Sequence, residues 1–372
     1  MSSIISTEQV SAGQPDKIAD QIADAIVTDC LKRDKDSRVA IEVLIKDYNI
    51  VIAGELTCAG HAPDYHELIN SVFKRIGKDR LGYNYKKFNV SVLVSRQSKD
   101  IALAVDKGGA GSQGTVYGYA TNETPELLPM PFVLATRLLE KLEKYGKVSK
   151  DERIKADAKA QVTFDYDNWR IVTFLCSVQT ARNTALRNTS LRNTASQDVR
   201  AVKKIVSNLM KDVAAERALN TDFQILINPT GRFEVGGPFA DCGVTGRKLA
   251  CDTYGGIGHI AQSSLSGKDC TKVDRSGAYM ARKIARDIVL AGFADKAEIQ
   301  IAYAIGVAKP VSIHVECFGT EHQEIGFIEE FIEKSYDLTP KGIIKKLKLL
   351  DVDYNKVSAY GHFGKKMLPW EE

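Results

Sequence analysis

The chain has 372 residues, of which 44% are hydrophobic and 26% are charged, and its formal net charge is +4. This is an ordinary soluble globular composition, and the small net charge excludes a protein that coats nucleic acid. No apolar run is long enough to span a membrane, and the N-terminus lacks the basic and apolar regions of a secretion signal. At this length we expect two or three domains.

The seven cysteines are scattered along the chain, and no two of them are spaced as CxxC. We therefore expect reduced thiols and a cytoplasmic location. The six histidines do not cluster with the cysteines, so a zinc site is not expected.

Apolar periodicity predicts alternating strands and helices. A helix should begin at Pro15, because proline suits the first helical position and Ile18, Ile22 and Ile26 follow at four-residue spacing. Paired strands accompanied by helices are typical of an α+β protein with repeated layers. Strands are expected at about 38–45, 49–56, 88–95, 161–166, 170–178, 223–227, 248–253, 297–305 and 311–317, and further helices at 131–143, 197–218 and 274–291.

Two segments fit neither a helix nor a strand. Residues 107–114 are rich in glycine and should form a mobile loop or a backbone platform for a ligand. Residues 182–195 repeat a pentad that begins Arg-Asn-Thr, and a period of five matches no regular structure. We expect a solvated surface loop there, and the alternative is a contact for another subunit or an acidic partner.

Glu42 is a carboxylate within an otherwise apolar strand. If the turn centres on Asp47 and Tyr48, Glu42 lies opposite Ala53 and diagonal to Glu55, so that both carboxylates share one face of the hairpin. A buried carboxylate there would need a cation or a charged substrate group, whereas an edge strand would simply expose it. The spacing leaves both possibilities open.

Basic residues gather in the last third of the chain. Arg247 and Lys248 follow a Thr-Gly pair, and Lys268 and Lys272 come soon after, next to Asp274. Such a group could hold a polyphosphate with its metal ion, although a solvated basic pair is the commoner origin of one short motif. The sequence contains no Walker-type phosphate loop.

Asp16 and Asp274 each lie at an expected helix N-terminus, where an acidic residue commonly caps the helix. Lys17 directly follows Asp16, so a mixed site for a metal ion and a phosphate is the functional alternative. The residues alone thus predict an enzyme that handles a nucleotide phosphate.

A series of long motifs resembles the methionine adenosyltransferase family, whose members are also called S-adenosylmethionine synthetases. The motifs fall in the family order and cover nearly the whole chain, which makes the series far more specific than any single motif. They occupy residues 13–21 (GQPDKIADQ), 119–124, 157–163 (DAKAQVT), 228–233 (NPTGRF), 236–238, 241–248, 252–256, 266–276, 303–308 and 360–364.

The resemblance implies three similar α+β domains around a pseudo-threefold axis, at residues 1–98, 112–230 and 232–372, with a mobile active-site loop at 99–111. It implies a homodimer with active sites between the subunits, and leaves open whether two dimers pair into a tetramer. It implies ATP and L-methionine as substrates and Mg²⁺ (two ions per site) and K⁺ as cofactors, with neither nucleic acid nor membrane as a partner.

The resemblance also assigns roles to single residues. Asp16 and Asp274 would hold magnesium, and Glu42 would hold potassium. Methionine would face Glu55, Gln97, Asp241, Lys272 and Ile305. ATP would face Gln14, Lys17, Asp157, Lys159, Arg232, Phe233, Asp241, Arg247, Lys248, Ser264 and Lys268. The catalytic set would be Lys159, Asp241, Arg247, Lys248, Lys268 and Lys272.

The sequence departs from the family pattern in a few places. Gln14 stands where the family usually has histidine, and Ala12 where it has glutamate. Ser112 replaces an aspartate of the glycine-rich loop, which is also shortened, and residues 258–265 replace a run of glycines. Gln14 can still donate a hydrogen bond to phosphate but cannot carry charge. These changes bear on rate and loop motion more than on reaction type.

Two other functions compete with this interpretation. A weak or inactive regulatory paralogue is favoured by Gln14 and the altered 258–265 segment, and opposed by the retention of the other charged ligands. A different ATP-using enzyme, such as a kinase, lacks support because its glycine-rich and catalytic-loop signatures are absent from the sequence.

Overall fold

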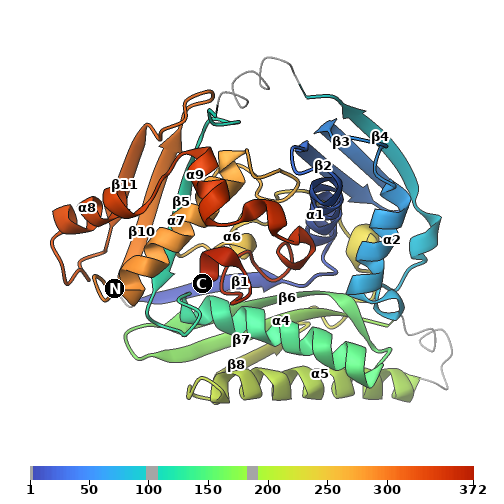
Figure 1. Cartoon of the computed structure of the whole chain (residues 1–372). Coiled ribbons are helices and arrows are strands. Elements are labelled where there is room, and N and C mark those ends of the chain that lie inside the picture. Colours follow the sequence, from blue (N-terminus) through green and yellow to red (C-terminus); the bar gives the residue numbers. More distant parts are fainter. Residues whose placement is uncertain (1–2, 98–107, 182–191) are drawn as a thin grey trace.

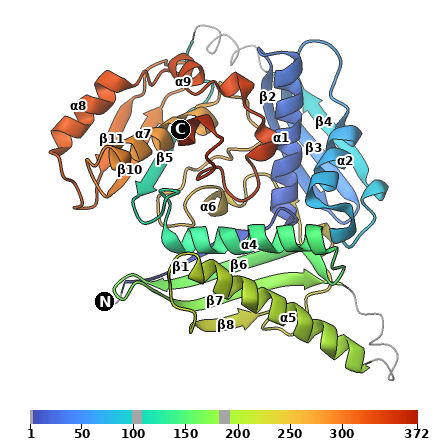
Figure 2. The same cartoon turned by 60° about the horizontal axis from the view of Figure 1, so that its bottom comes forward.

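The computed structural model describes residues 3–97, 108–181 and 192–372. These residues form three β-sheets with helices packed against them, and the three units stand around the centre of the molecule (Figures 1 and 2). The strand orders are β4-β3-β2-β9, β1-β6-β7-β8 and β11-β10-β5. The α+β class expected from the sequence is confirmed.

The first sheet is built on the expected hairpin. Its strands are β2 (Arg38–Lys46), β3 (Asn49–Thr57), β4 (Asn89–Ser95) and the short β9 (Gly243–Val244), and its helices are α1 (Pro15–Arg33) and α2 (Tyr65–Ile76). Alternation along β2 buries Val39, Ile41 and Val43 on the side of α1 and leaves Glu42 and Leu44 on the open face.

Helix α1 runs through the interior. Ile18, Ile22 and Ile26 have no exposed surface, as the four-residue spacing predicts for a buried stripe. The helix begins at Pro15, and the Gln14 side chain caps it by accepting from the Lys17 N–H. The predicted start of this helix is therefore confirmed.

The second sheet has a core of its own. Its strands are β1 (Ile4–Val10), β6 (Ile154–Asp165), β7 (Arg170–Thr180) and β8 (Gln224–Ile227). Helices α4 (Met130–Ser149) and α5 (Arg192–Ala215) belong to this unit, and both views draw them beside the sheet (Figures 1 and 2). Leu138, Phe174 and Met210 meet in the apolar layer between the helices and the sheet.

The third sheet lies against α7 (Val273–Leu290). Its strands are β5 (Gly114–Thr121), β10 (Lys296–Tyr303) and β11 (Ser312–Glu316), with α8 (Ile325–Ser335) and α9 (Pro340–Lys346) in the same unit. Helix α7 crosses β5 so closely that a Cβ on Gly118 would lie 1.9 Å from the Ala281 carbonyl carbon. Near the C-terminus, Trp370 stacks on Tyr279 of α7 with ring centroids 3.7 Å apart.

Each sheet contains one strand that comes from another third of the chain. Strand β1 pairs with β6, β5 pairs with β10, and β9 pairs with β2. The first strand of each third of the chain therefore lies in a neighbouring sheet, in cyclic order. This exchange ties the three units together through backbone hydrogen bonds.

Two sequence predictions are wrong. Residues 248–253 do not form a strand, because Leu249–Asp252 is the one-turn helix α6, closed by the Asp252 N–H on the Lys248 carbonyl at 2.9 Å. A short apolar run is compatible with both a helix and a strand, and here tertiary contacts determine which of the two forms. In the pentad repeat, residues 192–195 begin α5 and are not a loop, while residues 182–191 lie outside the described part of the chain.

Most of the expected active-site loop also lies outside the described residues, which resume at Gly108. From there the glycine-rich segment runs beside residues 305–307: Ala110 donates to the Val307 carbonyl at 3.1 Å and accepts from the Gly306 N–H at 2.9 Å. Across the described ranges, no helix has both the length and the apolar character needed to cross a membrane.

Candidate functional site

The N-terminus of α1 is the centre of a charged cluster. Asp16 has no exposed surface, and it does not cap its own helix because Gln14 does so. Its carboxylate instead accepts from the Val244 N–H at 2.9 Å, from the Gln14 side-chain amide at 3.0 Å and from the Lys248 ammonium at 2.5 Å. The capping role considered for Asp16 is therefore wrong, and its partners come from a distant loop.

Hydrogen bonds keep Asp16 ionised. Burial alone would raise its pKa, but the hydrogen bonds from Lys248, Val244 and Gln14 outweigh burial and hold the pKa below its usual value. Arg247 stands at the rim, with its Nε 3.8 Å from Asp16 Oδ1 and 51% of its side chain exposed. Arg247 and Lys248 thus present two cations beside one buried carboxylate.

Asp157 adds a second acid close by. Its Oδ2 accepts from the Gly237 N–H at 2.7 Å. Burial raises the pKa of Asp157 to about 6; the Gly237 hydrogen bond lowers it, and the carboxylates of Asp241 and Asp16 raise it. The sequence-predicted residues Asp16, Asp157, Asp241 and Lys248 therefore lie within electrostatic reach of one another.

A second cluster forms at the N-terminus of α7. Asp274 is 5% exposed and accepts from the Ser112 hydroxyl at 2.5 Å, so the residue that replaces an aspartate contacts a predicted metal ligand directly. The N-cap of α7 is Lys272, and Asp274 has no capping role. Burial lowers the pKa of Lys268, and the nearby carboxylates of Asp274 and Glu42 oppose that shift.

The predicted register of the hairpin is confirmed. Glu42 pairs with Ala53, and Glu55 pairs with Ala40, which places both carboxylates on the open face of the first sheet. Glu42 is exposed in the single chain because it lies on the open face of the sheet; β2 is an inner strand between β3 and β9, so the edge strand considered as the reason for its exposure is wrong. Glu42 therefore needs no cation within one chain.

Lys17 lies in the interior and not among groups that could meet ATP. Its side chain has no exposed surface, and its ammonium lies 2.7 Å from Asp20, forms an ion pair with Asp252 and donates to the Ser358 carbonyl at 3.1 Å. Burial opposes the charge on Lys17, but Asp20 and Asp252 raise its pKa well above its usual value. The ATP contact expected for Lys17 is not supported by this position.

Other predicted residues are spread around the two clusters. Lys159 pairs with Glu8 at 2.5 Å and Arg232 with Glu234 at 2.8 Å, both with well-exposed basic side chains. Lys272 pairs with the buried Asp269 at 2.5 Å. The Phe233 carbonyl accepts from the Thr180 N–H, and the Ser264 carbonyl accepts from the Lys268 ammonium. The Gln97 N–H donates to the Thr57 hydroxyl. Ile305 is 47% exposed.

The altered segment 258–265 is fixed by contacts of its own. His259 donates from Nδ1 to the Glu298 carboxylate at 2.5 Å, and its backbone N–H donates to the same carboxylate at 2.8 Å. Its ring stacks on Tyr117 with centroids 5.3 Å apart. A histidine in place of glycine thus anchors this segment to β10.

Sequence reasoning missed four buried residues behind the clusters: Asp20, Asp24, Asp252 and Arg275. Asp24 and Arg275 form an ion pair at 2.5 Å with neither side chain exposed. The available signal was the four-residue spacing of Asp16, Asp20 and Asp24 in a helix whose other face is apolar.

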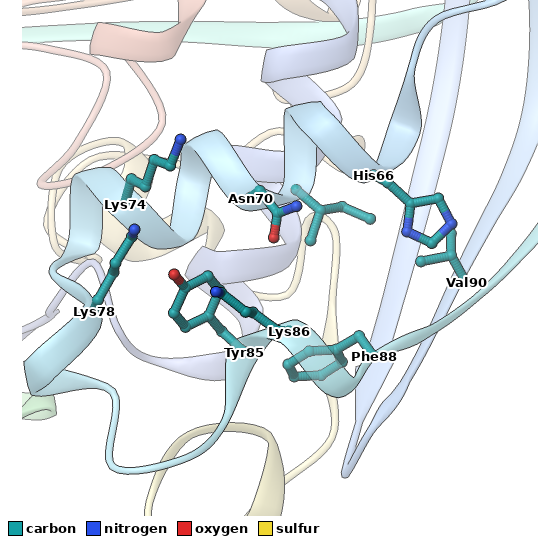
Figure 3. Close-up of a pocket in the computed structure, with 9 residues that line it drawn as sticks. His66, Asn70, Lys74, Lys78, Tyr85, Lys86, Phe88 and Val90 are labelled. Atoms are coloured by element: carbon teal, nitrogen blue, oxygen red, sulfur yellow. The ribbon is translucent and has the colours of Figure 1, made fainter.

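A pocket elsewhere carries none of the predicted residues. It has a volume of about 450 Å³ and lies between α2 and the start of β4 (Figure 3). The lysines that line it, Lys74, Lys78 and Lys86, are exposed to solvent. It is lined by His66, Ile69, Asn70, Lys74, Lys78, Tyr85, Lys86, Phe88 and Val90.

The described residues contain no group of three His, Cys, Asp or Glu side chains that would hold a metal ion by themselves. A metal at Asp16 or Asp274 would need other ligands, such as phosphate oxygens and water. This is the usual arrangement for Mg²⁺ bound with a nucleotide.

Comparison with known proteins identifies the family. Models of the N-terminal, central and C-terminal domains of S-adenosylmethionine synthetase match residues 2–99, 107–233 and 235–372. The chain is 41% identical to the S-adenosylmethionine synthase of Mycoplasma capricolum subsp. capricolum, over 99% of this chain and 94% of the relative. It is 42% identical to the S-adenosylmethionine synthase of Mesoplasma florum, over 100% and 98%. The resemblance seen in the motifs is confirmed, and the chain belongs to the S-adenosylmethionine synthetase family.

Proposed function

We propose that this protein is a methionine adenosyltransferase, which joins ATP and L-methionine into S-adenosylmethionine and releases diphosphate and phosphate. The observation that carries the proposal is the match of all three family domains over nearly the whole chain. The cation-rich clusters at the starts of α1 and α7 suit the reaction, because its leaving group is a triphosphate.

The proposed reaction requires cations that stabilise the leaving group, and it requires no general base. The methionine sulfur is already a good nucleophile, and it attacks C5′ of ATP while negative charge grows on the departing triphosphate. Preorganised positive groups stabilise that charge most effectively. Arg247, Lys248 and Lys268 are proposed for this role, with Lys159 and Arg232 at the rim of the ATP site, and alignment of sulfur with carbon supplies much of the remaining acceleration.

The other proposed substrate contacts come from acidic, amide, hydroxyl and apolar side chains. Asp157, Phe233 and Ser264 would face ATP, and Gln14 would face it only if its amide left Asp16. Asp241 would contact both substrates, since its carboxylate, like that of Asp16, lies close enough to Asp157 to raise the pKa of Asp157. Glu55, Gln97, Lys272 and Ile305 are proposed to face methionine.

Asp16 and Asp274 would hold magnesium, with two ions at each site, and these hard carboxylate oxygens fit that ion. Magnesium would neutralise charge on the phosphate oxygens. Lys248 donates to Asp16 Oδ2, so we expect its ammonium to turn toward phosphate when the Asp16 carboxylate holds an ion. Glu42 would provide a carboxylate for potassium.

The active site is proposed to be completed by a second copy of the chain. Glu42 and Glu55 lie on the open face of the first sheet together with Val51 and Leu93, of which Leu93 is 67% exposed. An apolar face that also bears site residues supports a homodimer with the sites in the interface.

We also propose a cytoplasmic location. All seven cysteines are free, and burial raises the pKa of Cys30, Cys176, Cys251 and Cys270 to about 12, so these thiols are unreactive. Reduced, inert thiols suit a reducing compartment.

The test is to incubate the purified protein with ATP, methionine, Mg²⁺ and K⁺ and to detect the sulfonium product by mass spectrometry. K248M is the matched control, because it removes one cation of the first cluster and should abolish most of the product. A weak or inactive regulatory paralogue is the second candidate, favoured by the internal engagement of the Gln14 amide with Asp16. A folded wild-type protein that forms no sulfonium would establish that candidate.

A further inference from the structure

The inner face of α1 carries three aspartates one turn apart, Asp16, Asp20 and Asp24, and none of them has exposed surface. Residues four apart lie on one side of a helix, so the three carboxylates point the same way. Each accepts a hydrogen bond from a backbone N–H that faces the helix: Asp16 from Val244 at the end of β9 at 2.9 Å, and Asp20 and Asp24 from the loop residues Gly246 at 2.8 Å and Gly267 at 3.0 Å. We call these three residues the acidic ladder.

Two of the three donors directly precede cations of the proposed triphosphate site. Gly246 is followed by Arg247 and Lys248, and Gly267 is followed by Lys268. The two glycines also allow the close approach. Gly246 has φ of 77° and a Cβ there would lie 2.6 Å from Ser264 Cβ, and Gly267 has φ of 83° and a Cβ would lie 2.0 Å from the Ile41 carbonyl oxygen.

Each carboxylate of the acidic ladder also has a cation of its own. Lys248 pairs with Asp16, Lys17 with Asp20 and Arg275 with Asp24. Pairing of this kind offsets part of the cost of burying a carboxylate. The three cations differ in access: Lys248 is 22% exposed, whereas Lys17 and Arg275 have no exposed surface.

This difference divides the acidic ladder by role. The Asp16 position can exchange its lysine with a ligand, because that lysine reaches solvent. The cations that pair with Asp20 and Asp24 are fully buried, so neither pair can be exchanged for a ligand from solvent. Arg275 reinforces the third position, since it donates to the Lys268 carbonyl at 2.9 Å while it holds Asp24.

We propose that Asp20 and Asp24 are positioning residues, which fix the two loops so that Arg247, Lys248 and Lys268 meet the triphosphate without rearrangement. This rests on the proposed function. Preorganised donors act only when they are held in place, and a displacement of about 1 Å can cost about a hundredfold in rate.

The experiment compares D20A, D20N and the control I26A, with kcat and KM measured at a temperature at which circular dichroism finds all of them folded. D20A removes the acceptor of the Gly246 N–H, whereas D20N keeps an oxygen in that place. I26A removes buried apolar surface from the same helix and makes no hydrogen bond to either loop. We expect D20A to lower kcat by about ten- to a hundredfold, D20N to keep most of the rate, and I26A to lose thermal stability with kcat unchanged.

Binding of inorganic tripolyphosphate, measured by calorimetry, tests the same idea without turnover. D20A should bind at least about tenfold more weakly than wild type, and D20N should bind nearly as well as wild type. If D20A does not fold, G246A tests the contact from the loop side, because its Cβ would push against Ser264, and it should show the same losses.

Three results would overturn the positioning role: D20A with unchanged kcat and tripolyphosphate affinity, D20N as impaired as D20A, or I26A as impaired as D20A. A wild-type protein that binds tripolyphosphate with this dependence on Asp20 but forms no sulfonium would refute the proposed function alone.

Discussion

Asp16 illustrates how far single residues can be understood from sequence. Its place at a helix N-terminus was predictable, because Pro15 and the isoleucine repeat mark the start of α1. Its hydrogen-bond partners were not predictable, because Val244 and Lys248 lie more than two hundred residues further along the chain. The motif resemblance pointed to these residues, and spacing alone could not bring them together.

Gln14 has two roles that a substitution can separate. It caps α1 through the Lys17 N–H at 3.0 Å and donates to Asp16 at 3.0 Å. Q14A should lower the free energy of unfolding by about 1 kcal/mol through the lost cap and should slow sulfonium formation. Q14H should be equal to wild type or faster and should add a pH dependence near pH 6.5, because imidazole titrates there.

These outcomes are measured as rates between pH 6 and 9 with saturating substrates, together with urea unfolding. A Q14A enzyme as fast as wild type would mean that Gln14 makes no contact in the transition state.

Asp157 should make stability depend on pH in an unusual direction. The folded-state pKa of about 6 lies above the usual 3.8, so ionisation of Asp157 costs the folded protein stability. This cost is absent below about pH 4, grows as pH rises toward 6 and is complete above it. Relative to wild type, D157N should therefore gain about 3 kcal/mol of unfolding free energy between pH 4 and 7.

Urea unfolding at several pH values measures this gain. D222N is the control with the opposite sign, because hydrogen bonding by Asn220 lowers the pKa of the exposed Asp222. A difference between D157N and wild type that stays constant with pH would contradict the account.

Among the secondary-structure elements, those with a long periodic pattern were predicted correctly, whereas a short segment was not. Helix α1, the hairpin of β2 and β3 and the register of Glu42 against Ala53 agree with prediction, because alternation and four-residue spacing persist over many residues. Residues 248–253 were predicted as a strand, but Leu249–Asp252 is helical. Asp252 turns inward to the Lys17 ion pair, a contact that no local pattern encodes.

The Lys17–Asp252 pair joins α1 to α6, and K17M tests whether that link is structural. Removing one partner of a buried ion pair leaves uncompensated charge, so K17M should lower the free energy of unfolding by about 3–5 kcal/mol. Its KM for ATP should stay near the wild-type value at a temperature where the protein is folded. A raised KM for ATP without loss of stability would instead restore Lys17 as an ATP ligand.

At the scale of the whole molecule, three units exchange their first strands in a cycle, which places the starts of α1 and α7 beside loops from other units (Figure 1). Local periodicity does not specify such long-range pairing, so the sheet orders could not be derived from the sequence. In the proposed dimer, a second chain would complete the site at the open face that carries Glu42 and Glu55.

L93D tests the proposed dimer. Leu93 lies opposite Ala53 on the open face and is 67% exposed, so a charge there should prevent two apolar faces from associating. Sedimentation should find L93D monomeric and inactive, whereas L290D, at the exposed end of α7, should remain dimeric and active. A monomeric L93D with full activity would contradict a shared site.

The proposed reaction is best tested by following the fate of ATP with chromatography and phosphorus NMR. We expect one sulfonium product, one diphosphate and one phosphate for each ATP consumed, in a reaction that requires methionine. Formation of ADP, or ATP consumption that does not depend on methionine, would contradict it.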